Sequence, residues 1–168
     1  MSDHPVAGLD PRYAAAWDAW VATLALQLLD EPDRGSALVL TAPRELARPR
    51  QVAPRRFLGL RPAIMERTAP WVELRRVEDH LAGRCIGSAA MGSGFPISED
   101  EDAALLALGW RRPGLGEDKA YIRWWPDDVP HAAYLPAEEA ARAAQMVAAT
   151  LRDVFAVTDP ATLGLTRR

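Results

Sequence analysis

The chain is poor in the residues that form disulfides and hold metals. Its 168 residues include one cysteine, Cys85, and three histidines, at positions 4, 80 and 131. A single cysteine excludes an intrachain disulfide, and no histidine has a partner at the HxH or HxxxH spacing typical of metal ligands. We therefore expect neither a metal site nor a cofactor.

Long apolar runs and excess positive charge are also missing. The first residues, MSDHPVAGLD, lack the basic stretch and apolar run of a signal peptide. The best candidate for a membrane helix, AAAWDAWVATLALQLL, is interrupted by Asp18 and Gln27. The formal net charge of −3 and the pI of about 5.6 argue against non-specific nucleic-acid binding. These features predict a cytoplasmic protein that binds neither a membrane nor nucleic acid.

The composition that remains is typical of a folded globular domain. Hydrophobic residues make up 49% of the chain and charged residues 26%, so there is enough apolar surface for a self-supporting core. At this length we expect one domain across 1–168, with a flexible tail at 1–9 and the ordered part at 10–160.

Helical signals occur in three segments, at about 11–30, 99–108 and 136–155. The first follows an Asp-Pro start and has an apolar surface broad enough to need two neighbours. The second begins with a Ser98 capping box and ends at Gly109. The third is the clearest amphipathic element.

Strand signals lie between and around these helices. Strands are predicted for ALVLT at 37–41, RFLGL at 56–60, WVELRRV at 71–77, LAGRCIGSA at 81–89 and YIRWW at 121–125. The third and fourth suit an antiparallel hairpin, whereas prolines limit any strand between 42 and 70 to a short or edge strand. The order of elements predicts an α+β fold, in which an N-terminal helix, a short middle helix and a long C-terminal helix pack on an antiparallel sheet.

The last of these strands is rich in aromatic residues. We assign Ile122 and Trp124 to the face that packs against the helices, and Tyr121, Arg123 and Trp125 to the outer face. Aromatic residues and arginine dominate the energetics of protein interfaces, so the outer face is a candidate contact surface. The candidate partner-binding residues are Trp20, Leu58, Trp71, Tyr121, Arg123 and Trp125.

Catalytic chemistry has weak support. A Cys85–His80 pair would need a thiolate beside a base, but strand alternation places Cys85 with Leu81 and favours a buried structural cysteine. The acidic run from Glu99 to Asp102 is explained by the positive end of a helix dipole. We therefore predict no catalytic residue, while an enzyme built on Cys85 and His80 stays open as an alternative. The arginines between 44 and 67 are either scattered surface charges or a basic region that holds an acidic partner.

Three stretches in the second half carry a family resemblance: LLALGWRRP at 105–113, YIRWWP at 121–126 and AATLRDVFAVTDPATL at 148–163. They resemble the bacterial TY-Chap proteins, which belong with type III secretion chaperones and YbjN-like proteins. The resemblance covers about 95–165 well and the first half only by the order of its elements. It implies a non-enzymatic domain, often dimeric, in which helices cover one face of a curved sheet and which holds peptides or partly unfolded clients. It transfers no site residue.

The sequence thus predicts a chaperone-like adaptor that binds an extended segment of a secreted or effector client. An exposed sheet edge and an aromatic patch would make the contact. The alternative is a small-molecule-binding or regulatory protein that uses a pocket between sheet and helices. The broad first helix also predicts a homodimer.

Overall fold

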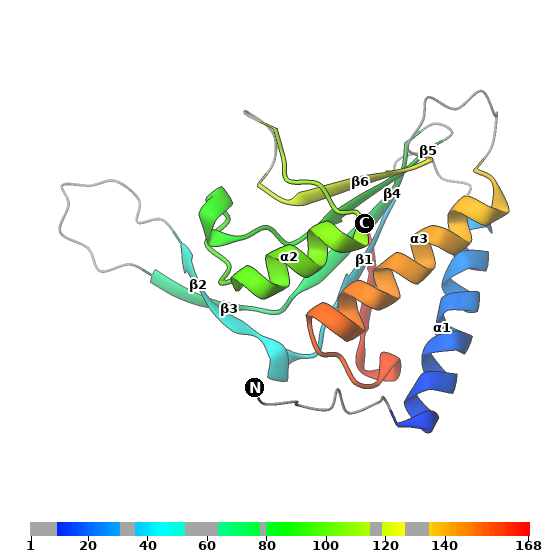
Figure 1. The fold of residues 1–168 in the computed structure, drawn as a ribbon, viewed down its shortest axis with the longest axis horizontal. Coiled ribbons are helices and arrows are strands. Elements are labelled where there is room, and N and C mark those ends of the chain that lie inside the picture. The colour runs from blue at the N-terminus through cyan, green and yellow to red at the C-terminus, as the bar shows by residue number, and fades with distance from the viewer. Residues whose placement is uncertain (1–9, 31–35, 53–63, 78–79, 115–118, 127–134) are drawn as a thin grey trace, which may run out of the picture.

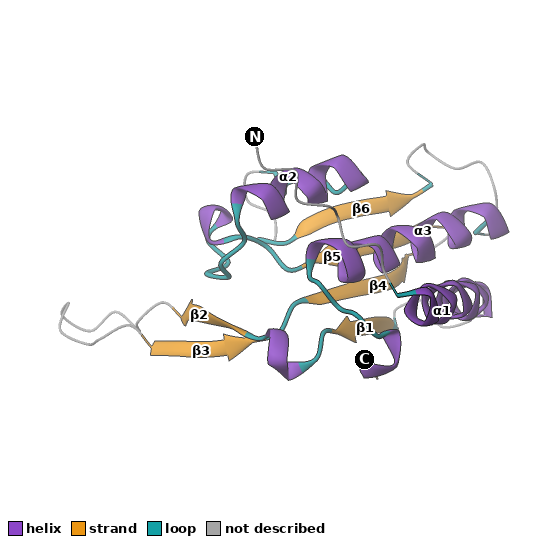
Figure 2. Ribbon diagram, turned by 60° about the horizontal axis from the view of Figure 1, so that its bottom comes forward, coloured by secondary structure: helices purple, strands orange, loops and turns teal. Residues whose placement is uncertain are grey.

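Three helices lie over one face of a five-stranded antiparallel sheet in the computed structural model (Figures 1 and 2). The structure describes residues 10–30, 36–52, 64–77, 80–114, 119–126 and 135–168. The helices are α1 (Pro11–Asp30), α2 (Glu99–Leu108) and α3 (Ala137–Ala149). The strands are β1 (Ala37–Thr41), β2 (Arg48–Val52), β3 (Ile64–Thr68), β4 (Trp71–Val77), β5 (His80–Cys85), β6 (Tyr121–Trp125) and β7 (Gly164–Arg167). The predicted α+β class and the order of its three helices are confirmed.

The main sheet has the strand order β6-β5-β4-β1-β7. The β4–β5 hairpin matches the prediction, with Val77 paired to His80 at its closed end. Strand β7 was not predicted and lies beyond residue 160, where the sequence places the end of the domain. It pairs with β1 and forms one edge of the sheet, with all four of its residues exposed.

Strands β2 and β3 form a separate two-stranded sheet. The strand expected at 56–60 lies outside the described residues, as does the tail at 1–9. At the base of this small sheet, Arg48 makes a bidentate ion pair with Glu101 of α2, with N–O distances of 2.8 and 2.5 Å. Glu101 also accepts a hydrogen bond from the backbone N–H of Ser98, so one carboxylate both caps α2 and joins it to β2.

Helices α1 and α3 fill the core above the centre of the sheet. Trp17, Leu24 and Leu28 of α1 are buried, and alanines on α3 allow the two helices to pack closely. The Trp17 indole N–H donates to the carbonyl of Thr158 at 3.1 Å. This contact ties α1 to the segment that leads into β7.

The predicted orientation of β6 is wrong. Tyr121 and Trp125 are buried beneath the helices, whereas Trp124 is 41% exposed on the opposite face. Alternation separates the two faces of a strand but does not say which one meets the core. That choice depends on a neighbour, because Gly83 of β5 has no side chain and leaves the space that the Trp125 ring occupies.

The turn after α2 places a third aromatic ring in this core. Gly109 adopts the left-handed conformation predicted for a helix cap, with φ at 102°, and the Trp110 amide donates to the carbonyl of Leu105. The Trp110 indole N–H then donates to Thr150 Oγ at 2.8 Å. Its ring also meets Trp125 edge to face, with centroids 6.1 Å apart. Trp110 therefore joins α2, β6 and the end of α3.

Candidate functional site

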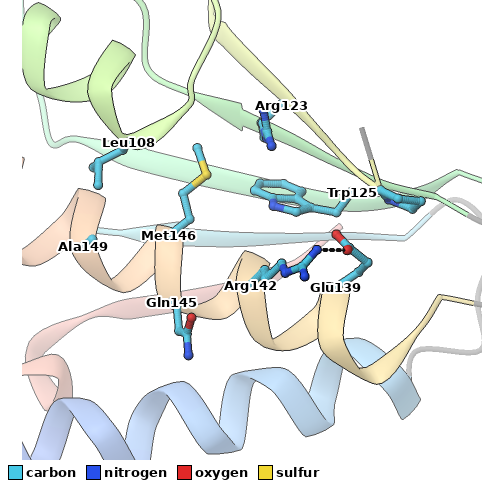
Figure 3. Close-up of a pocket in the computed structure, with 9 residues that line it drawn as sticks. Leu108, Arg123, Trp125, Glu139, Arg142, Gln145, Met146 and Ala149 are labelled. Carbon is cyan, nitrogen blue, oxygen red and sulfur yellow. Dashed lines mark hydrogen bonds and ion pairs between the residues drawn. The ribbon is translucent and has the colours of Figure 1, made fainter. Parts of the chain in front are cut away.

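A groove of about 480 Å³ lies between β6, α3 and the C-terminal end of α2 (Figure 3). We call it the β6–α3 groove. Its volume falls within the roughly 300–1,000 Å³ typical of ligand sites in proteins. Its lining residues are Leu108, Arg123, Trp125, Pro126, Glu139, Arg142, Gln145, Met146 and Ala149.

The apolar part of the groove is built on Trp125. This ring is 2% exposed and is fixed by the space at Gly83 and by the edge of Trp110. Met146 faces it from α3, and Leu108 closes the end formed by α2 (Figure 3). A methionine adapts its shape to different neighbours at low cost, so this floor suits apolar side chains of more than one shape.

The polar part of the groove carries two guanidinium groups and one carboxylate. Arg123 projects from β6 and donates to the carbonyl of Gly109 at 3.3 Å. Arg142 pairs with Glu139 one turn earlier on α3. The Arg142 side chain is 65% exposed and that of Glu139 14%, so the guanidinium faces solvent while its carboxylate partner is largely covered.

Among the described lining residues there is no thiol, hydroxyl or imidazole to act as a nucleophile or a base. Adaptable apolar surface beside a few charged groups is suited to holding a ligand.

The structure does not bring Cys85 and His80 together. They stand five residues apart on β5, roughly 16 Å along the strand, on opposite faces. Cys85 is fully buried, as predicted, and burial raises the pKa of its thiol. The His80 ring instead packs edge to face against Trp124.

The acidic start of α2 is explained by internal contacts. Asp102 accepts hydrogen bonds from Arg112 and from the Tyr121 hydroxyl, and these contacts lower its pKa. Burial, reinforced by the Asp102 carboxylate, raises the pKa of Tyr121. Within the described ranges, no three His, Cys, Asp or Glu side chains gather closely enough to hold a metal ion. No described helix has the length and apolar character needed to cross a membrane.

The six predicted contact residues end up in different places. Arg123 and Trp125 meet in the groove, although on the face opposite to the one predicted for them. Tyr121 is 0% exposed and has no surface to offer a partner. Leu58 lies outside the described residues.

The other two predicted residues lie away from the groove. Trp20 is half-buried against Trp17, with ring centroids 5.3 Å apart. Trp71 is half-buried under the Arg84 guanidinium on the side of the sheet without helices.

Sequence reasoning missed the residues that α3 contributes to the groove. Arg142 and Met146 are four positions apart and share one face of the helix. Their spacing was visible in the sequence, but nothing there showed that this face lies beside β6.

The fold and the groove together define a helix-covered antiparallel sheet domain with a partly apolar, ionic binding groove. The family model described as "T3SS (YopN, CesT) and YbjN peptide-binding chaperone 3" matches residues 10–168, and the chain belongs to this family, TY-Chap3. The match confirms the resemblance seen in the second half and extends it over the first. Comparisons with curated proteins and with solved structures give no match.

Proposed function

We propose that this domain is a non-enzymatic, chaperone-like module that holds a short segment of a client protein in the β6–α3 groove. The main observation in support of the proposal is the position of Trp125. Its ring forms the floor of a 480 Å³ groove that also contains guanidinium groups. Membership of a family described as peptide-binding chaperones supports a client of this kind.

The groove offers a client two kinds of contact. An apolar side chain of the client packs against the half-buried Met146 and Leu108, above the buried Trp125 ring, and removes their apolar surface from water. Client carbonyl or carboxylate groups accept hydrogen bonds from the Arg142 guanidinium, whose side chain is 65% exposed. The apolar contact supplies most of the affinity, because exposed ion pairs contribute only about 0.2–1 kcal/mol each.

The test is a peptide library screened against the purified chain and against two variants. Met146→Lys puts a charged chain into the groove, and the matched control Met65→Lys places the same change on β3, where Met65 is 57% exposed. We expect bound peptides to lose affinity at least about tenfold with Met146→Lys and to keep it with Met65→Lys. Equal binding to both variants, or a library with no binder, would contradict the proposal.

A second candidate function is a small-molecule receptor that uses the same groove. The groove volume favours it, because 480 Å³ is enough for a ligand of drug-like size. Native mass spectrometry of protein purified without denaturation separates the two candidates. A bound metabolite that Met146→Lys abolishes would support the receptor, and its absence beside peptide binding would support the client-binding function.

We also propose that the chain forms a homodimer through α1. Leu26 and Leu29 are 64% and 38% exposed on this helix, a pair of apolar side chains that a partner helix would bury. Light scattering at tens of micromolar, on the order of usual working concentrations, should give twice the chain mass. Leu26→Glu should return the monomer mass, and a wild-type monomer would refute the dimer.

A further inference from the structure

The face of the sheet opposite the helices, which we call the open face, has a composition that solvent contact alone does not explain. In the part of the chain that is described, the three helices lie on the other side (Figures 1 and 2). The exposed face of an antiparallel sheet is usually polar, yet this one presents Trp71, Ile122 and Trp124. Trp124 is the most exposed of the large apolar side chains on its strand.

A hollow of about 210 Å³ lies on this face between β1, β4 and β5. It is lined by Val39, Thr41, Trp71, Glu73, Arg84 and Arg168. The Arg84 guanidinium lies 5.8 Å from the centre of the Trp71 ring, a cation–π contact that fixes both groups at the edge of the hollow.

The charges around the hollow do not balance. Glu73 is only 7% exposed, and one of its oxygens is shared by Arg84 at 3.3 Å and Arg75 at 3.5 Å. Arg168 adds a third guanidinium, because its backbone pairs with Ala37 and places it at the same hollow. Two arginines thus contact one carboxylate, and a third lines the same hollow, on a protein whose net charge is −3.

This local excess of positive charge sets the chemistry of an occupant. A partner that brings carboxylates to the hollow gains attraction to all three arginines, whereas a basic partner is repelled. Trp71 and Val39 offer an apolar floor beside these charges. The occupant that meets both features is an acidic segment with aromatic or aliphatic residues between its acids.

We propose that the open face is a second docking surface, separate from the β6–α3 groove, and that it takes an acidic segment of a partner protein. Carboxylates of that segment bind Arg75, Arg84 and Arg168, and an apolar residue rests on Trp71. The groove lies on the other side of the sheet, so a substitution can abolish binding at one site and leave binding at the other intact.

The test uses the full chain and two labelled synthetic peptides, one alternating glutamate with tyrosine and the other alternating lysine with tyrosine. Fluorescence anisotropy should show binding of the glutamate peptide only, and added salt should weaken it. In a ¹⁵N correlation spectrum the Trp71 indole signal should shift while the Trp125 indole signal stays in place. Equal binding of both peptides, or shifts confined to Trp125, would overturn the proposal.

Matched arginine variants complete the test. Arg75→Gln removes a half-exposed arginine from the open face and leaves Glu73 with Arg84, while Arg12→Gln removes an exposed arginine that pairs with Asp10 at the start of α1, outside both sites. We expect Arg75→Gln to lower affinity for the glutamate peptide about twofold to fivefold and Arg12→Gln to leave it unchanged. Equal affinities of the two variants would refute the open-face site. Circular dichroism confirms that both variants are folded.

Discussion

Substitution of Gly83 by alanine tests whether the floor of the groove depends on a missing side chain. An alanine Cβ at this position would lie 2.5 Å from Cζ3 and 2.8 Å from Cη2 of Trp125, and 3.3 Å from Cη2 of Trp110. Carbon atoms in good contact are about 3.5–4.0 Å apart, so the Trp125 ring would have to retreat by roughly 1 Å. The edge of Trp110 and the burial of both rings resist that movement.

The expected cost follows from these distances. Overpacking of a core costs about 1–3 kcal/mol, and alanine recovers about 0.5–1 kcal/mol relative to glycine in a strand. The free energy of unfolding of Gly83→Ala should therefore fall by about 1–2 kcal/mol. With a urea dependence of about 2 kcal/mol per molar, the unfolding midpoint drops by roughly 0.5–1 M. Urea titration followed by circular dichroism measures this shift.

Gly164 provides a matched control on β7. The nearest atoms to an added Cβ there are 3.7 and 3.8 Å away, at ordinary contact distance. Gly164→Ala should leave stability unchanged or slightly higher, because only the entropy of the unfolded chain changes. If Gly83→Ala were as stable as Gly164→Ala, the claim that Gly83 makes room for Trp125 would be refuted. The double variant Gly83→Ala/Trp125→Leu should lose less stability than the sum of the single changes.

Three further predictions concern the core and the capped helix. Thr150→Val removes the acceptor of the buried Trp110 indole N–H, which should cost about 1–3 kcal/mol of unfolding free energy, measured by urea titration; an unchanged midpoint would show that the bond contributes nothing. Burial alone would raise the Glu101 pKa, but hydrogen bonds from Arg48 and the start of α2 outweigh it and lower the pKa below 4.5. The lowered pKa implies stability that is fully present above pH 4.5 and is lost as the pH falls through the folded-state pKa; urea midpoints across this range should fall less steeply for Arg48→Gln than for the wild type. Because it is buried, Cys85 should gain no mass from iodoacetamide until denaturant is added. Rapid alkylation of the folded chain would instead support the alternative of an enzyme built on Cys85 and His80.

The parts of the fold that the sequence predicted correctly depend on local chemistry. The Ser98 capping box and the left-handed Gly109 are set by residues within a few positions of each other. The long amphipathic pattern of α3 likewise predicts, by itself, a helix with one buried face. Such signals need no knowledge of the rest of the chain.

The errors come from interactions between distant segments. The face of β6 was assigned by alternation alone, while the deciding residue, Gly83, lies on another strand. Strand β7 has four residues with Leu165 as its one large apolar side chain, too few to show an alternating pattern, and it forms because β1 offers it an edge. The groove needs β6 and α3 side by side, so Met146 could not be assigned to it from its own neighbours.

The two adjacent tryptophans at the end of β6 now have separate roles. Trp125 floors the groove under the helices, and Trp124 stands on the open face beside His80. Because neighbouring residues of a strand point to opposite sides of the sheet, no single side chain of a client can touch both rings. A client that uses both surfaces must therefore pass around the β6 edge of the sheet. Trp124→Ala should then weaken only ligands of the open face, whereas a change at Trp125 alters both the groove and the core that supports it.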